Sequence, residues 1–152
     1  MGLVEIDNPD YYKEHILNYN GDNKIESIFA GKSNGSMGVM LCFKKERFEM
    51  KEMHQFSIAS DETGTVNNHI CLFTILKDKQ TGKELNIILT HLKAKFHNSK
   101  IREKEIEQIS QYISERDLTS KSFILLGDFN TVPTSDNYKQ VEKIGLTPAF
   151  EL

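Results

Sequence analysis

The sequence of 152 residues lacks long apolar runs, and its longest hydrophobic stretches have the length of strands. A helix needs about 20 apolar residues to cross a bilayer, so no membrane contact is expected. No apolar segment follows Met1 as it would in a signal peptide. We therefore expect a cytoplasmic protein, with mitochondria as the alternative for a longer parent protein.

Cysteine is scarce, with only Cys42 and Cys71 in the chain. Both lie within apolar runs, "GVMLCF" and "HICLFTIL". This setting predicts two buried thiols in a reducing compartment rather than a disulfide or a metal pair.

Positive charge is not in excess, because the formal net charge is -3. No global positive field draws the protein to nucleic acid or to an anionic membrane, so an anionic ligand needs a local basic cluster. The composition, with 38% hydrophobic and 27% charged residues, fits one globular domain over residues 1–152 with an ordinary core. The sequence contains no internal repeat and no low-complexity segment.

The remaining pattern predicts strands and helices in a mixed order. Asn8 as N-cap and Pro9 at the first helical position begin a short helix, which presents one apolar face: Tyr12, Ile16 and Tyr19. Three strands, expected to form an antiparallel run, follow at 25–30, 38–43 and 47–58.

Two long apolar segments, 69–76 and 85–92, are predicted to be adjacent strands joined by a turn at Thr81-Gly82. Both are apolar almost throughout, which indicates central strands covered on both faces. Another strand is expected at 122–127. Helices are predicted from Asn98 to about Arg116 and from near Ser135, with these residues facing inward: Ile106, Ile109 and Ile113 in the first, Tyr138, Val141 and Ile144 in the second.

Polar side chains follow three of the predicted strands. Glu5 comes after "LV", His91 lies in "LTHLK", and Asp128 and Asn130 lie in "GDFN". Loops at strand ends are held by a rigid sheet yet stay open to solvent. Carboxylates suit Mg²⁺ and an attacking water, whereas an amide and an imidazole can bind phosphoryl oxygens.

Each motif also has a structural explanation. "GDFN" alone is a good turn, and we assign structural roles to the other four histidines: His15, His54, His69 and His97. A basic group after His91 is either the solvated side of a helix or an anion-binding cluster; its members are Lys93, Lys95, Lys100, Arg102 and Lys104.

The motifs together resemble the endonuclease/exonuclease/phosphatase superfamily, and within it the nocturnin-like group related to the carbon catabolite repressor type deadenylases. The resemblance lies in four stretches that occur in the family's order: "LVEIDNPDYY", "MGVMLCFKKERF", "LTHLKAK" and "ILLGDFNTVPTSDNY". It implies an α/β fold, a two-sheet sandwich flanked by helices, here truncated at both ends.

The same resemblance implies a role for each motif residue. Glu5 would hold Mg²⁺, and His91 would contact the scissile phosphate. Asp128 would orient the attacking water, and Asn130 would steady the phosphoryl group. Basic residues near the substrate phosphates would be Lys32, Lys93 and Lys95.

The sequence departs from the family pattern at several positions. Val4 stands where glutamine is usual, Met37 where aspartate is usual, and Glu105 where glutamine is common. The family's upstream asparagine strand, later aspartate and terminal histidine motif have no counterpart here. We therefore expect a partial catalytic domain with uncovered apolar faces and, alone, little turnover.

Three functions are compatible with these observations. The first is a Mg²⁺-dependent phosphatase that removes the 2′-phosphate of NADP(H). The second is a 3′-exoribonuclease acting on poly(A) RNA, and the third is a catalytically incomplete fragment that binds a partner or nothing. The sequence leaves the oligomeric state open.

Overall fold

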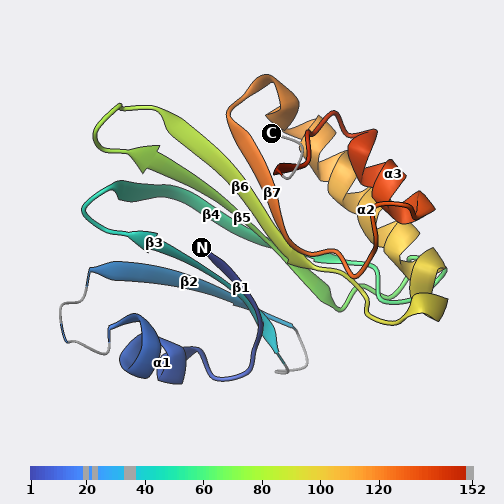
Figure 1. Cartoon of the computed structure of the whole chain (residues 1–152), viewed down its shortest axis with the longest axis horizontal. Helices are drawn as coiled ribbons and strands as arrows, with labels where there is room; N and C mark the ends of the chain where they lie inside the picture. Colours follow the sequence, from blue (N-terminus) through green and yellow to red (C-terminus); the bar gives the residue numbers. More distant parts are fainter. Residues whose placement is uncertain (19–20, 22–23, 33–36, 150–152) are drawn as a thin grey trace.

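The chain forms two β-sheets with helices on their outer sides, as the computed structural model shows for residues 1–18, 21, 24–32 and 37–149 (Figure 1). One sheet has three strands in the order β1-β3-β2, and the other has four in the order β4-β5-β6-β7. The strand bounds are β1 Gly2–Ile6, β2 Ile25–Gly31, β3 Gly38–Lys44, β4 Phe48–Ile58, β5 His69–Asp78, β6 Glu84–His91 and β7 Phe123–Asp128. This arrangement confirms the predicted α/β sandwich.

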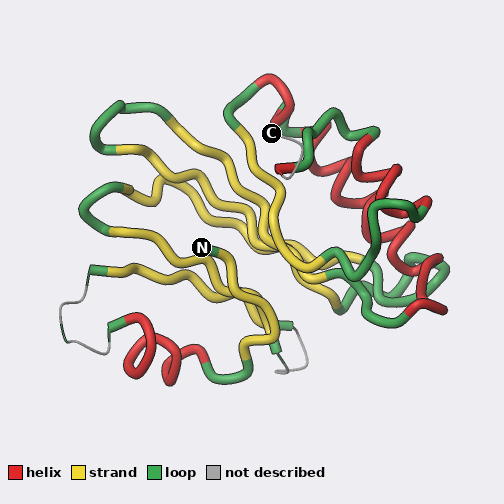
Figure 2. The backbone as a smooth tube through the Cα atoms, in the orientation of Figure 1, coloured by secondary structure: helices red, strands yellow, loops and turns green. Residues whose placement is uncertain are grey.

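The core between the sheets is built by alternate residues of their facing strands. Leu41 and Phe43 of β3 lie in one cluster with Leu72 of β5 and Leu89 of β6. The chain neighbours of Leu72 and Leu89, Phe73 in β5 and Ile88 in β6, point to the opposite face of the sheet and pack beneath α2. As predicted, β5 and β6 are therefore central strands covered on both faces (Figure 2).

The third predicted strand does not join the antiparallel run. β2 and β3 pair antiparallel as expected, but β4 pairs with β5 in the other sheet. The edges of β3 are already occupied by β1 and β2, so β4 has no edge of that strand to pair with. The chain therefore changes sheets at the charged corner that precedes Phe48.

The first helix is capped as predicted but shorter. The side chain of Asn8 accepts a hydrogen bond from Tyr11 N at 3.1 Å, and α1 (Pro9–Tyr12) continues into the π-helical turn η1 (Lys13–Leu17). A wider π-turn shifts the apolar face by one residue. Leu17 therefore packs against the same core cluster as Tyr12, whereas Ile16 is 52% exposed, contrary to prediction. Tyr19, also predicted on this face, lies outside the described residues, as does the loop at 33–36.

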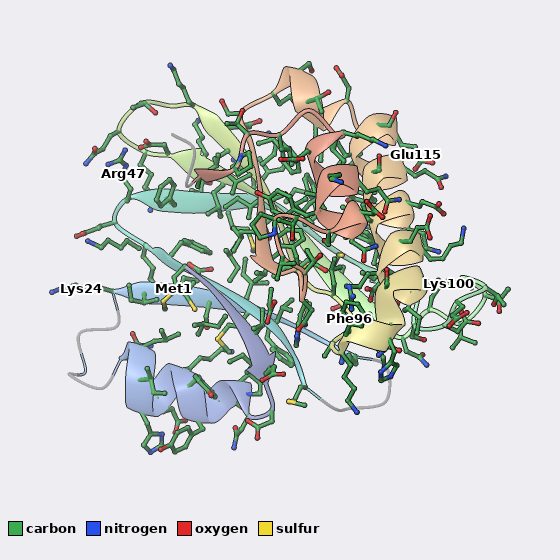
Figure 3. All side chains as sticks on the ribbon, turned by 45° about the vertical axis from the view of Figure 1, so that its right-hand side comes forward. Met1, Lys24, Arg47, Phe96, Lys100 and Glu115 are labelled. Carbon is green, nitrogen blue, oxygen red and sulfur yellow. The ribbon has the colours of Figure 1, made fainter. Side chains whose placement is uncertain are left out.

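The two remaining helices, α2 (Ser99–Glu115) and α3 (Asp136–Glu142), cover the four-stranded sheet. Short 3₁₀ turns precede and follow α2: η2 (Phe96–Asn98) and η3 (Leu118–Ser120). As predicted, Ile106, Ile109 and Ile113 are buried, and α3 begins near Ser135, whose side chain caps the helix. Figure 3 shows Phe96 and Lys100 beside the start of α2, far from Arg47.

Both cysteines are free and buried, as predicted. Burial raises the pKa of the Cys71 thiol to about 12, and it also raises the pKa of Cys42. Within the described part of the chain, no helix is long and apolar enough to span a membrane.

An apolar groove of about 560 Å³ opens between the sheets. Leu41 and Phe43 line it from β3, and Ile124 and Leu126 line it from β7, which is an edge strand of its sheet. Ile124 is 44% exposed. The groove agrees with the expected uncovered apolar surface.

Candidate active site

The site lies where β6 and β7 end side by side. These strands are parallel, and their register pairs His91 directly with Asp128. His91 and Asp128 are the last residues of their strands. The backbone hydrogen bonds between the two strands therefore fix the positions of both residues. The two motifs "LTHLK" and "GDFN" thus meet although they lie far apart in the sequence.

Gly127 allows this close pairing. Its φ is +142°, and a Cβ atom there would lie 1.8 Å from the carbonyl oxygen of Thr90. Any other residue would clash with the neighbouring strand, so glycine is required directly before Asp128.

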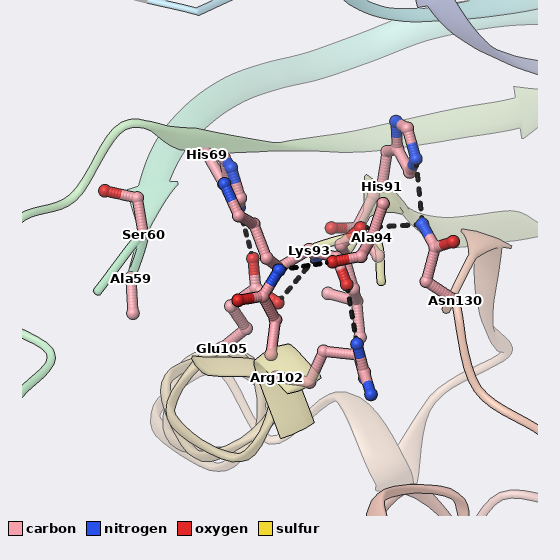
Figure 4. Close-up of polar contacts among 12 residues, drawn as sticks. Ala59, Ser60, His69, His91, Lys93, Ala94, Arg102, Glu105 and Asn130 are labelled. Atoms are coloured by element: carbon pink, nitrogen blue, oxygen red, sulfur yellow. Dashed lines mark hydrogen bonds and ion pairs between the residues drawn. The ribbon is translucent and has the colours of Figure 1, made fainter. Parts of the chain in front are cut away.

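Asn130 turns back over the strand ends. Its Nδ2 lies 3.0 Å from Nε2 of His91 and 2.9 Å from the carbonyl oxygen of Leu92, and its backbone N donates to Asp128 Oδ1 at 2.8 Å. Its φ of +48° lies in the left-handed region, where asparagine is tolerated. The turn predicted from "GDFN" therefore exists, and it also holds three predicted site residues in contact. Figure 4 shows the contact between Asn130 and His91.

A cavity of about 430 Å³ adjoins these residues. Of the predicted site residues, those that line it are Glu5, Lys32, His91, Lys93 and Lys95. Asp128 and Asn130 do not line it but are joined to His91 by register and hydrogen bonds. The structure thus brings the predicted residues to one region, while their individual roles stay predictions.

Glu5 reaches the cavity from a bulge in β1. The register between β1 and β3 shifts between Leu3 and Ile6, and Glu5 has a φ of +59°. A bulge redirects a side chain at the cost of local backbone strain. The Glu5 carboxylate is exposed, and no residue in the described ranges binds it.

The loop that carries Lys93 and Lys95 is anchored from below by α2. Buried Arg102 donates to the carbonyl oxygens of Lys93 at 2.9 Å, Lys95 at 2.8 Å and Phe96 at 3.5 Å. The anchor binds main-chain atoms (Figure 4), and both lysines line the cavity. Arg102 is therefore a positioning residue rather than part of a solvated helix face, one of the two alternatives given above.

Two of the histidines that were assigned structural roles, His69 and His97, line the cavity. His69 also contacts Glu105 of α2. The signal for His69 was the unusual acid at position 105, whose buried carboxylate requires a partner.

Known proteins similar to this chain include nocturnins and other proteins of the same fold. No family model matches the chain. Curated sequences of nocturnin from Homo sapiens and Xenopus laevis are 27% and 26% identical over 123 and 126 residues, which is 79% of this chain. The chain spans only 28% and 31% of those two proteins.

Solved structures show the same fold. The human nocturnin catalytic domain, with bound sulfate, superposes with a TM-score of 0.75 at 24% identity, over 91% of this chain and 53% of that one. ANGEL2, described as a 2′,3′-cyclic phosphatase, gives 0.75 at 20% identity, covering 93% and 42%. A mannosyl-6-phosphatase from Bacteroides thetaiotaomicron gives 0.67 at 21% identity, covering 80% and 49%.

Proposed function

We propose, from the premise that the chain is nocturnin-like and has the endonuclease/exonuclease/phosphatase fold, that it carries part of the active site of a Mg²⁺-dependent phosphatase. Its substrate would be NADP(H), from which it removes the 2′-phosphate. The observation that carries this proposal is the cavity lined by Lys32, Lys93 and Lys95 beside the contact between His91 and Asn130.

The size and charge of the cavity favour a small anionic substrate. A volume of about 430 Å³ lies within the usual range of small-molecule sites. Three lysines supply a local positive field, although the whole chain has a net charge of -3. An extended RNA track draws on many more phosphate contacts, so NADP(H) is favoured over poly(A).

The proposed reaction is attack of water on the 2′-phosphate. Asp128 accepts a proton from the water, the water oxygen bonds to phosphorus, and the bond from phosphorus to the ribose oxygen breaks. Inorganic phosphate leaves, and the 2′-oxygen takes up a proton. His91 and the lysines stabilise negative charge on the phosphoryl oxygens, while Asn130 orients His91.

The chain offers one carboxylate to Mg²⁺ in the cavity. Glu5 is exposed there, and among the described residues no group of three or more acidic, histidine or cysteine side chains gathers as a metal site. This fits a hard cation that keeps several waters and takes further oxygens from the substrate. When bound, Mg²⁺ would neutralise negative charge on the substrate phosphate.

The relatives support phosphate chemistry at this fold. The human nocturnin domain holds a sulfate, an analogue of phosphate in shape and charge, and two other structural neighbours are described as phosphatases. These names belong to those proteins, and their fold is what this chain shares.

The proposal is tested under single-turnover conditions. The chain in excess, with Mg²⁺, is incubated with NADPH or with oligo(A), and released inorganic phosphate or AMP is measured beside human nocturnin. We expect phosphate from NADPH, at a rate more than about tenfold below that of the longer relative. The control is Asp128→Asn, which keeps the size of the side chain and should release none.

Other products would favour the alternatives. AMP from oligo(A) in excess over phosphate would support the exoribonuclease function. No product from either substrate would support a catalytically incomplete fragment and contradict the proposal.

A further inference from the structure

A buried contact between His69 and Glu105 adjoins the cavity, and the histidine forms part of the cavity wall. His69 is the first residue of β5 and is only 7% exposed, and its Nδ1 contacts Oε1 of Glu105. Glu105 lies on α2 with no exposed surface. The pair joins the four-stranded sheet to the helix at the edge of the cavity (Figure 4).

Both oxygens of Glu105 are engaged. Oε2 accepts a hydrogen bond from the backbone N of Lys93 at 2.9 Å, and Oε1 takes the His69 contact. An ionised carboxylate without solvent needs a compensating charge. Arg102, the other buried cation nearby, donates to backbone carbonyls and forms no ion pair with Glu105 among the described residues. His69 is therefore the direct charge partner.

The contact with Glu105 also fixes the ring atoms of His69. A carboxylate only accepts, so Nδ1 carries a proton. Among the described residues, Nε2 makes no hydrogen bond, and it is not one of the fully buried atoms that lack a partner. Because the imidazole lines the cavity, Nε2 is the atom left for a ligand.

His69 approaches the cavity differently from His91. The register pairs Cys71 with Thr90, and continuing it by two residues places His69 opposite Leu92. Leu92 packs in the core beneath α2, and neighbouring side chains in a strand alternate between faces. His69 and His91 therefore enter the cavity from different faces of the sheet edge, which places them to contact different groups of one ligand.

We propose that His69, charged through Glu105, is a further substrate-binding residue that donates from Nε2 to a second phosphate of the substrate. This inference rests on the proposed function and refines it: the preferred substrate carries a phosphate or diphosphate in addition to the phosphate that is removed. In NADP(H) that group is the diphosphate bridge. A nucleoside 2′-monophosphate lacks it.

The test compares two ligands that share a 2′-phosphate. Binding of NADP⁺ and of 2′-AMP to the whole chain is measured by calorimetry in EDTA, which prevents metal-dependent turnover. The variant combines His69→Gln with Glu105→Gln. The amide introduced at position 105 can accept from Lys93 N and donate to the amide introduced at position 69, so the wall stays hydrogen-bonded but loses its cation.

We expect the paired variant to bind NADP⁺ about tenfold more weakly, the loss expected for one charge-assisted hydrogen bond. Its affinity for 2′-AMP should stay within about twofold of the original chain, because that ligand has no second phosphate. Equal losses for both ligands, no loss for NADP⁺, or no NADP⁺ binding by the original chain would overturn the inference.

A second measurement uses the unchanged protein, so it does not depend on whether the variant folds. The ¹⁵N resonance of His69 Nε2 should shift on addition of NADP⁺ and stay in place with 2′-AMP. If both results hold but Mg²⁺ gives no hydrolysis, the proposed function fails while the binding role of His69 stands.

Discussion

Nδ2 of Asn130 lies 3.0 Å from Nε2 of His91, and it also lies 2.9 Å from the carbonyl oxygen of Leu92. A carbonyl accepts only, which identifies the amide nitrogen as the atom that faces both. The amide then donates to Nε2, so the proton of the neutral His91 ring is on Nδ1. Asn130 thereby sets the tautomer of the residue proposed to meet the phosphate.

Removing this contact should slow catalysis more than it affects folding. Asn130→Ala deletes both side-chain hydrogen bonds, and we expect the single-turnover rate of phosphate release to fall about 10²-fold.

Asp128→Ala should abolish turnover with the fold intact, because it removes the group that orients the water. Rapid-quench assays and circular dichroism check both variants. Near-normal turnover by Asp128→Ala would refute its assignment.

Replacement of Gly127 should be strongly destabilising. In Gly127→Ala the new Cβ would meet the Thr90 carbonyl oxygen at 1.8 Å, with a φ of +142°. We expect the free energy of unfolding in urea to fall by more than about 2 kcal/mol, from backbone strain together with the clash. The matched control is Gly82→Ala, where φ is +72° but no atom lies within 4 Å. A loss at position 127 no larger than in the control would contradict this account.

Arg102 should determine the order of the loop that carries the two cavity lysines. Arg102→Met removes the guanidinium from the carbonyls of Lys93 and Lys95 and leaves them unsatisfied. We expect hydrogen exchange at residues 93–98 to accelerate at least about tenfold and NADPH affinity to fall, although both lysines remain. Lys100→Met, an exposed change on the same helix, should alter neither. Unchanged exchange in Arg102→Met would show that the loop is held by other contacts.

The pairing of Arg47 with Asp78 should make stability depend on pH in acid. Two hydrogen bonds, of 2.9 and 2.7 Å, join the guanidinium to the carboxylate and hold the pKa of Asp78 well below its usual range. A lowered pKa in the folded state means that the stabilisation is present above the unfolded pKa of about 4. It is lost as the pH falls below that value toward the folded pKa.

Asp78→Asn should therefore flatten the decline of the urea midpoint between about pH 4 and about pH 2. The control Asp136→Asn changes an exposed acid at the start of α3, and it should keep the slope. A slope that is the same in Asp78→Asn and in the original chain would show that other carboxylates cause the decline.

The sequence was sufficient for the features that depend on local pattern. The apolar runs of β5 and β6, the isoleucines of α2, the cap at Asn8 and the start of a helix near Ser135 each follow from neighbours within a few residues, and the structure confirms them. The pairing of β4 failed because it depends on which sheet edges are already occupied. Ile16 failed because a single π-turn shifts the face of a helix without changing its composition.

The motif resemblance named the individual residues of the candidate site. It did not predict the backbone features and contacts that hold those residues in place. The bulge and positive φ at Glu5 and the carbonyl contacts of Arg102 arise from tertiary packing. His69 was missed because its character depends on a carboxylate 36 positions away. A histidine in an apolar strand has no local feature that distinguishes a structural role from a binding role.

Arg102 binds the loop through carbonyl oxygens, so these contacts hold the loop backbone without involving its side chains. Every amino acid at positions 93, 95 and 96 offers the same acceptor, so the anchor does not depend on which side chains the loop carries. Lys93 can therefore be exchanged for other residues while the loop keeps its path. Lys95 has a φ of +75°, so replacements there must also tolerate this strained backbone conformation. Substrate preference at this cavity is accordingly free to diverge, in evolution or by engineering, on a scaffold that need not change with it.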